Sequence, residues 1–445
     1  MLLYILRPIV RLALWIFFRK IDVRGHDRVP SDRSLIFAAN HPNVMLDTLI
    51  LGLTLPPDPR FLGKSTLFKN PFYAWFLRQL GVIPVARTRD RGSRTYSNRD
   101  MLRAACGALR DGHSLVIFPE GISHAEIKVR DLKPGAARIA LRTEAETDGQ
   151  TGICIVPIGL TYTDPGLFRS DVSVHFGEAI EILPFLRAYR ENRNAAEQDL
   201  TTQVHERLTA LTRHIDNPNL RTVINDLSAI YTDTVADEIP DSSELSRKLQ
   251  AQQEIIHAVH HFARTDPELV RTFAERLCAH HRKLRRLRLS PNLPPALSPP
   301  AGHLLLALLT SPIVLYGFIH NALPYYLPRL FVRPYRDKPE TIGTVKMAAG
   351  AVLFPLWYLI LVGVACLFMD LQNALIYGLT LPTSGLVTLL FDEHILQKWP
   401  LWQSVVLPRK RRYYLNRLSR ERATIIHDLD AIKERYRSKK SGDGF

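Results

Sequence analysis

A histidine and an aspartate follow a short apolar run near the start of the chain. The run Leu35–Ala38 leads into the segment 40–47, which reads NHPNVMLD and holds His41 and Asp47 one to two helical turns apart. An imidazole at the end of a buried strand can take a proton from a hydroxyl, while a carboxylate fixes its tautomer and stabilises the imidazolium. The pattern therefore predicts a base, His41, and an orienting acid, Asp47, that together make an alcohol nucleophilic.

The composition indicates a chain with polyanionic partners. Its 445 residues are 46% hydrophobic, enough for two or three domains with a sizeable core. There are 58 Lys and Arg against 43 Asp and Glu, a net charge of +15, which suits nucleic acid, anionic lipid or phosphorylated substrates. Long uncharged segments favour anionic membrane lipid. The basic runs lack interleaved aromatic side chains that would stack on bases, so we expect no nucleic-acid role.

The cysteines and histidines predict neither a disulfide nor a metal site. The four cysteines are scattered without a CxxC pair, which is typical of a reduced, cytosol-facing protein. His257 and His261 have the spacing of a metal pair, but no adjacent acidic residue completes a site. We therefore expect no metal.

Three further blocks lie downstream of the histidine segment. They are 81–87 (GVIPVAR), 118–123 (FPEGIS) and 156–159 (VPIG). With 40–47, in this order and spacing, they resemble the glycerolipid acyltransferase family, which includes the glycerol-3-phosphate and 1-acylglycerol-3-phosphate acyltransferases. Each block alone would arise often by chance, whereas the set of four is specific.

The resemblance implies an acyl transfer at His41. This residue would remove the proton from an acceptor hydroxyl, which then attacks the thioester carbonyl of an acyl donor, and Asp47 would hold the imidazole. No serine or cysteine is placed beside His41 as a nucleophile, so we expect direct transfer without an acyl-enzyme. The donor would be acyl-CoA or an acyl carrier protein, and no further cofactor is expected.

The other blocks supply candidate substrate contacts. Arg87 offers a planar fork for a phosphate dianion, although its arginine-rich surroundings also fit a solvated basic face or a site for the donor's phosphates. Lys64 adds a second positive charge, and Glu120 would bind acceptor hydroxyls beside backbone N–H groups. In this chain Ile-Ser-His follows the glycine of the third block, where the family commonly has Thr-Arg or Thr-Ser. The predicted substrate-binding residues are Lys64, Arg87, Glu120, Gly121 and Ser123.

The spacing of the first block departs from the commonest form of the family. Five residues separate His41 from Asp47, whereas the family usually has four. One extra residue rotates Asp47 by about 100° around an ideal helix. For Asp47 to reach the imidazole, the helix must begin later or carry a bulge. We interpret the spacing as the mark of a subfamily.

Short apolar runs alternate with helical patterns between residues 30 and 190. This alternation predicts an α/β layered domain with functional residues at strand ends and on the following loops. Expected strands cover 34–38, 61–63, 80–85, 114–118, 153–158 and 172–176; expected helices follow Pro42 and cover 72–79, 94–110 and 134–144.

The flanking regions predict membrane attachment. The apolar first eighteen residues carry Arg7 and Arg11 on one helical face, which favours an interfacial helix; a buried amphipathic helix of the soluble domain is the alternative. Uncharged stretches at 347–369 and 371–391 are each long enough to span a bilayer. The stretch 304–327 is interrupted by Pro312 and Pro324, and basic flanks at 282–288, 329–346 and 409–440 prefer the cytoplasmic side. A re-entrant path of 304–327 keeps all three flanks there, whereas a spanning path does not.

These patterns divide the chain into seven regions. They are an interfacial helix (1–29), a catalytic domain facing the cytoplasm (30–190), a helical accessory region (191–290), a proline-rich linker (291–303), a re-entrant or spanning segment (304–327), a two-span hairpin (347–391) and a basic cytoplasmic tail (408–445).

The favoured function is acylation of 1-acyl-sn-glycerol-3-phosphate at a membrane. Glycerol 3-phosphate and dihydroxyacetone phosphate stay open as acceptors, because a polar headgroup pocket serves all three. A non-catalytic lipid-binding membrane protein is the alternative from another class. The sequence leaves open the acyl-chain length, the choice between coenzyme A and acyl carrier protein, and the oligomeric state.

Overall fold

The chain forms two compact units, which are described separately. The first comprises Met1–Asp216 with Val332–Met347, and the second comprises Asn217–Phe331 with Ala348–Phe445. The structure is a computed structural model. It describes residues 2–56, 59–85, 97–215, 217–240, 243–286, 301–395 and 409–442.

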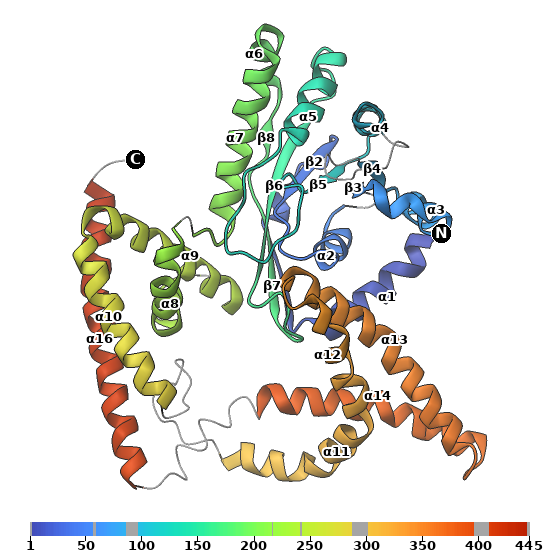
Figure 1. Cartoon of the computed structure of the whole chain (residues 1–445), viewed down its shortest axis with the longest axis vertical. Helices are drawn as coiled ribbons and strands as arrows, with labels where there is room; N and C mark the ends of the chain where they lie inside the picture. Colours follow the sequence, from blue (N-terminus) through green and yellow to red (C-terminus); the bar gives the residue numbers. More distant parts are fainter. Residues whose placement is uncertain are drawn as a thin grey trace. The chain divides into compact units, whose positions relative to one another are not determined.

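An eight-stranded sheet is the centre of the first unit (Figure 1). The strand order is β1-β7-β6-β2-β5-β3-β4, with β8 beside β6. Neighbours from β6 to β4 are parallel, as are β1 and β7, while β6 is antiparallel to β7 and β8. The strands are β1 (Lys20–Arg24), β2 (Leu35–Ala39), β3 (Arg60–Lys64), β4 (Ile83–Val85), β5 (Leu115–Ile117), β6 (Cys154–Tyr162), β7 (Asp171–Phe176) and β8 (Ile180–Glu181).

Helices cover both faces of this sheet, so its central strands are apolar on both sides. In β2, Ile36 and Ala38 pack with α4, α5 and α7, whereas Leu35 and Phe37 pack with α1 and α2. Continuous apolar runs of this kind are typical of buried parallel strands, and the predicted α/β layered domain is confirmed. The helices of this unit are α1 (Leu2–Phe17), α2 (Leu46–Thr54), α3 (Pro71–Gln79), α4 (Asn98–Arg110), α5 (Gly135–Glu146), α6 (Leu186–Glu191) and α7 (Arg193–Leu211).

The first 29 residues are not one membrane helix. Residues Lys20–Arg24 form β1, which extends the sheet beside β7, so the predicted boundary of the catalytic domain is wrong here. The preceding α1 buries Leu14 and Phe17 in the core and leaves Leu12 and Trp15 exposed. One side of α1 therefore packs on the domain, as the alternative of a buried amphipathic helix predicts, and contact of its exposed apolar side with a membrane stays a prediction.

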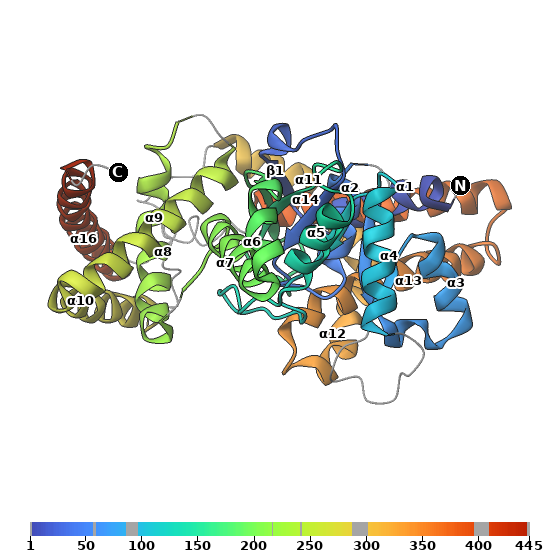
Figure 2. The same ribbon diagram turned by 90° about the horizontal axis from the view of Figure 1, so that it is seen from above.

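The first unit also extends beyond residue 190, the predicted end of the catalytic domain. Helix α7 packs against α5 and β6, because Leu200, Val204 and Leu208 form a buried stripe at four-residue spacing on an otherwise polar helix. Helices α4, α5 and α7 lie side by side (Figure 2) and share one buried cluster with Ile36 and Ala38 of β2. The predicted boundary at residue 190 is therefore wrong. The polar composition of this segment made its buried apolar stripe difficult to recognise in the sequence.

The second unit contains the accessory helices and the basic tail. The tail is helical and is tied to the accessory region: Tyr231 donates to Asp430 at 2.6 Å, and Arg276 pairs with Asp428 at 2.8 Å. These helices are α8 (Arg221–Ala236), α9 (Glu244–Thr265), α10 (Pro267–Arg286) and α16 (Arg409–Gly442).

Three helices among the described residues are long and apolar enough to cross a membrane. The candidate spans are Leu305–Phe331, Pro339–Ala365 and Leu371–Glu393. Helix α11 continues through Pro312 and Pro324, so the interruption that the sequence suggested is not in the helix. Most of the predicted linker, up to residue 300, lies outside the described residues. The helices are α11 (Ala301–Tyr326), α12 (Pro328–Phe331), α13 (Pro339–Ala365) and α14 (Leu371–His394).

In the predicted topology, 304–327 is re-entrant and 347–391 is a two-span hairpin. Helix α11 is continuous, and Leu305–Phe331 is itself a candidate span. The re-entrant and the spanning path of 304–327, and the side on which each flank lies, therefore stay predictions.

Cysteine labelling tests this topology. Single cysteines at Asp337 and Ser441, in a chain lacking its four native cysteines, should resist an impermeant thiol reagent in intact cells and react once the membrane is opened. A cysteine at Asp370, between the candidate spans Pro339–Ala365 and Leu371–Glu393, is the matched position that should react from outside. Labelling of Asp337 or Ser441 in intact cells would contradict the arrangement.

Candidate active site

The predicted site residues lie at one edge of the sheet. His41 comes two residues after β2, Glu120 three residues after β5, and Lys64 ends β3. These strands are parallel neighbours in the order β2-β5-β3, so their carboxyl ends lie together. Ligand sites in open α/β sheets form at this edge.

The structure brings His41 and Asp47 together. The imidazole Nδ1 lies 2.8 Å from Asp47 Oδ2. Helix α2 begins only at Leu46, so residues 41–45 are a non-helical loop and Asp47 stands in the first turn. The later helix start predicted from the five-residue spacing is therefore confirmed. An ionised carboxylate can only accept, so Nδ1 carries the proton and Nε2 is the basic nitrogen.

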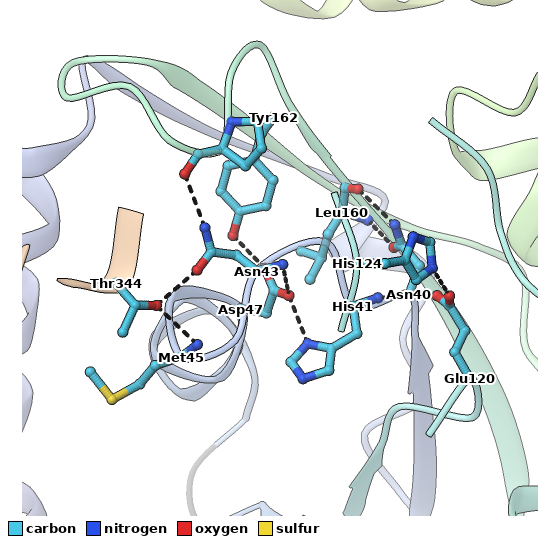
Figure 3. A network of polar contacts seen from close by, with 11 residues as sticks. Asn40, His41, Asn43, Met45, Asp47, Glu120, His124, Leu160, Tyr162 and Thr344 are labelled. Carbon is cyan, nitrogen blue, oxygen red and sulfur yellow. Dashed lines mark hydrogen bonds and ion pairs between the residues drawn. The ribbon is translucent and has the colours of Figure 1, made fainter. Parts of the chain in front are cut away.

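Asp47 is fully buried and accepts hydrogen bonds from three groups (Figure 3). Besides His41, the Asn43 N–H donates at 2.7 Å and the Tyr162 hydroxyl donates at 2.5 Å. Burial raises the pKa of Asp47, an effect that these hydrogen bonds oppose. Burial, followed by the charge of Asp47, raises the pKa of the Tyr162 hydroxyl well above its ordinary value. Tyr162 therefore stays a neutral donor to the carboxylate.

The ring and the backbone of His41 are both held in place. Phe118 stacks on the imidazole with ring centroids 3.9 Å apart. The His41 N–H donates to Glu120 Oε1 at 3.2 Å, and the His41 carbonyl accepts from the His124 N–H at 3.0 Å. The imidazole keeps 10% of its surface exposed. This arrangement suits proton transfer at Nε2 by a pre-oriented base.

Comparisons with known proteins find similar acyltransferases. The sequence model of the family described as Acyltransferase matches residues 20–161. The 1-acyl-sn-glycerol-3-phosphate acyltransferase of Borreliella burgdorferi is 29% identical over 201 residues, which cover 44% of this chain and 75% of that protein. A chloroplastic 1-acyl-sn-glycerol-3-phosphate acyltransferase of Arabidopsis thaliana is 31% identical over 147 residues, covering 33% and 37%.

Residues 20–161 thus match the acyltransferase family model, and the similar proteins are named as acyltransferases of glycerolipid synthesis. Glycerol-3-phosphate O-acyltransferase 1 of Saccharomyces cerevisiae is also similar, at 28% identity over 191 residues that cover 42% of this chain and 24% of that protein. The chain thus spans well under half the length of the plant and yeast relatives.

Within the acyltransferase domain, Glu120 is engaged on both oxygens. Its Oε1 accepts from the His41 N–H, and its Oε2 is in close contact with Nε2 of the buried His124. Glu120 is only 4% exposed. A carboxylate engaged in this way supports the loop that carries His41, so the geometry favours a positioning role over the acceptor contact expected from the sequence.

The structure describes three of the other four predicted substrate contacts: Lys64, Gly121 and Ser123. Lys64 is half-buried at the end of β3, and Ser123 is half-buried in the turn after Gly121. Gly121 has a φ of 74° and packs so close to Lys133 that a Cβ atom would lie 2.7 Å from its Nζ, which places a cation beside the turn that the sequence did not single out. Arg87 lies outside the described residues, and its contact with a phosphate stays a prediction.

Four residues that the sequence analysis did not single out complete the site. Asn43 and Tyr162 bond to Asp47, His124 pairs with Glu120, and Thr344 bonds to Asn43. Asn43 stands inside the first block and His124 directly follows the third, so their polar side chains could have been noted from the sequence. Tyr162 and Thr344 lie far from His41 in sequence, so only the fold brings them to the site.

Proposed function

We propose that the protein is a membrane-bound O-acyltransferase that moves a fatty acyl chain from an acyl thioester to the free hydroxyl of 1-acyl-sn-glycerol-3-phosphate. The observation that carries the proposal is the buried Asp47 oriented on Nδ1 of His41 at the carboxyl edge of an acyltransferase domain. The catalytic unit would face the cytoplasm, where acyl thioesters are made.

The reaction follows from the protonation state of the pair. Nε2 of His41 takes the proton of the acceptor hydroxyl as its oxygen attacks the thioester carbonyl. The new C–O ester bond forms, the C–S bond breaks, and the imidazolium returns the proton to the departing thiolate. Asp47 stabilises the imidazolium between these two transfers. Among the contacts described for the His41 ring there is no serine or cysteine, which supports direct transfer.

The acceptor assignment is supported by the similar proteins. The Borreliella and Arabidopsis relatives are named as 1-acyl-sn-glycerol-3-phosphate acyltransferases. The yeast relative is named as a glycerol-3-phosphate acyltransferase, so glycerol 3-phosphate, and with it dihydroxyacetone phosphate, is the second candidate acceptor. A membrane protein that binds lipid without catalysis is the remaining alternative, and the intact hydrogen bonding of the His41–Asp47 pair argues against it.

An acceptor panel tests the proposal. Purified full-length protein in detergent is incubated with labelled acyl-CoA or acyl carrier protein and, separately, with each of the three acceptors, and the lipid products are resolved by mass spectrometry. We expect phosphatidate from 1-acyl-sn-glycerol-3-phosphate, with kcat/KM at least about tenfold above the other acceptors.

The panel also separates the alternatives. A preference for glycerol 3-phosphate or dihydroxyacetone phosphate would show that the protein catalyses the first acylation of the acceptor, not the second. Binding of acyl lipid without turnover, under conditions in which a related acyltransferase is active, would leave the lipid-binding alternative. A requirement for acyl carrier protein over coenzyme A would identify the donor.

A further inference from the structure

A distant segment of the chain touches the loop that carries the catalytic pair. Thr344, in the first turns of α13, donates from its Oγ1 to Asn43 Oδ1 at 2.9 Å across a sequence separation of 301 residues. The same hydroxyl oxygen accepts from the Met45 N–H at 3.2 Å, and the Glu340 carbonyl accepts from the Val44 N–H at 3.1 Å. All of these residues belong to the catalytic unit.

Bonds from α13 hold the two residues that directly precede helix α2. The N-cap residue, Met45, provides no side-chain hydrogen bond, but its own N–H, one of the N–H groups at a helix start that need acceptors, donates to Thr344 Oγ1. The Glu340 carbonyl accepts from Val44, one residue earlier. Because Asp47 follows Met45 by two residues in the first turn of α2, these bonds also restrict the position of its carboxylate.

A second set of hydrogen bonds connects Thr344 with the carboxylate of Asp47. Asn43 is fully buried; its Oδ1 accepts from Thr344, and its backbone N–H donates to Asp47 Oδ2. That oxygen is the one facing Nδ1 of His41. The side-chain amide of Asn43 is also held by the Pro165 carbonyl at 3.0 Å, so the asparagine has one orientation in which it can serve the pair (Figure 3).

Close packing holds α13 against the loop. A Cβ atom at Gly343 would lie 2.9 Å from Leu46 Cδ1 and 3.0 Å from Asn43 Nδ2, and it would collide with the Pro165 carbonyl. Lys346 donates to the Gly166 carbonyl at 2.6 Å. Gly343 therefore permits the approach that brings the Thr344 hydroxyl within bonding distance of Asn43.

We propose that Thr344 is a positioning residue for the His41–Asp47 pair, and that docking of the start of α13 on the loop 43–46 is needed for full acyl transfer. The inference rests on the proposed function. It makes the first turns of α13 part of the catalytic unit. The later turns of the same helix are a candidate membrane span.

Three substitutions on one helix test the role. Thr344→Val removes the hydroxyl and keeps the shape, Thr344→Ser keeps the hydroxyl, and Thr341→Val makes the same change one turn away. Since one hydrogen-bonding group is lost, we expect Thr344→Val to lower kcat by about fivefold to tenfold with both KM values within about twofold. Thr344→Ser should restore most of the rate, and Thr341→Val should match the wild type.

A double-mutant cycle distinguishes positioning from a general loss of structure. If Thr344 acts through Asp47, Thr344→Val should cost less than about twofold once Asp47 is already Asn. An equal loss in both backgrounds, or equal rates for Thr344→Val and Thr341→Val, would overturn the proposal.

Amide hydrogen exchange supplies a readout that needs no activity. In Thr344→Val the Met45 amide loses its acceptor, so peptides covering residues 43–47 should exchange faster than in the wild type and in Thr341→Val. Unchanged exchange would refute the positioning role. If the wild type transferred no acyl group, the proposed function would fail, and the exchange data would still decide whether α13 orders the loop.

Discussion

Replacing His41 by alanine should lower acyl transfer by about 10²–10⁴-fold, because the acceptor hydroxyl then lacks the base that takes its proton. The loss should appear in kcat, since the imidazole acts on the reacting proton and holds neither the phosphate nor the acyl chain. The rate is measured with labelled acyl-CoA and the preferred acceptor, and the fold is checked by circular dichroism and by the unfolding temperature.

The matched control is a histidine far from any site residue. His427 has an 87% exposed side chain on α16, and His427→Ala should keep the wild-type rate. A His41→Ala protein with activity within about threefold of the wild type would remove His41 from the mechanism. A protein that has lost its near-ultraviolet signal would instead report a damaged loop.

The sequence predicted the elements whose signal is local. Apolar runs such as Leu35–Ala38 end in polar segments, and parallel strands with that pattern must be covered on both faces. The strand positions and the edge on which His41 and Glu120 lie followed from these runs. The start of α2 also followed, because only a helix that begins after residue 45 lets a five-residue spacing bring Asp47 to the imidazole.

The missed features depend on contacts between distant parts of the chain. Lys20–Arg24 reads as a polar stretch after an apolar helix, and it becomes a strand only because β7 offers it an edge. Leu200 and its neighbours at four-residue spacing gain their partners from α5 and β6. Thr344 is an unremarkable threonine before an apolar stretch, and its role appears only when α13 lies on the loop.

The roles predicted for the site residues stay predictions, and for one of them, Glu120, the structure shows partners that the sequence did not suggest. The resemblance assigned Glu120 to acceptor hydroxyls, but the structure engages both oxygens of that carboxylate with His41 and His124. A histidine in place of the usual residue after the third block gives this glutamate an internal partner. The sequence pattern does not show that Glu120 and His124 form a pair, because this contact depends on how the loop folds.

Replacing Asp47 by asparagine should lower kcat by about 10²–10³-fold while the fold stays intact. The amide can keep every hydrogen bond of the carboxylate: its oxygen can accept from His41 Nδ1–H and the Asn43 N–H, and its NH₂ group can donate to the Tyr162 hydroxyl. The substitution therefore removes only the negative charge. That charge stabilises the imidazolium, which forms only during proton transfer, so the loss should appear in kcat and not in KM.

The raised pKa of Asp47 predicts a second result for Asp47→Asn: the variant loses activity but does not lose stability. Since burial raises that pKa above its ordinary value, the folded state binds the proton of Asp47 more tightly than the unfolded chain does, and folding loses stability as the pH rises from about 3.8 through the raised pKa. At neutral pH the ionised carboxylate is thus unfavourable to folding, and Asp47→Asn should unfold at a temperature no lower than the wild type. Tyr162→Phe removes one donor without removing the charge and should cost less than about tenfold in kcat. A fully active Asp47→Asn enzyme would show that the imidazolium needs no charged partner, and the buried carboxylate would then serve only to hold the loop.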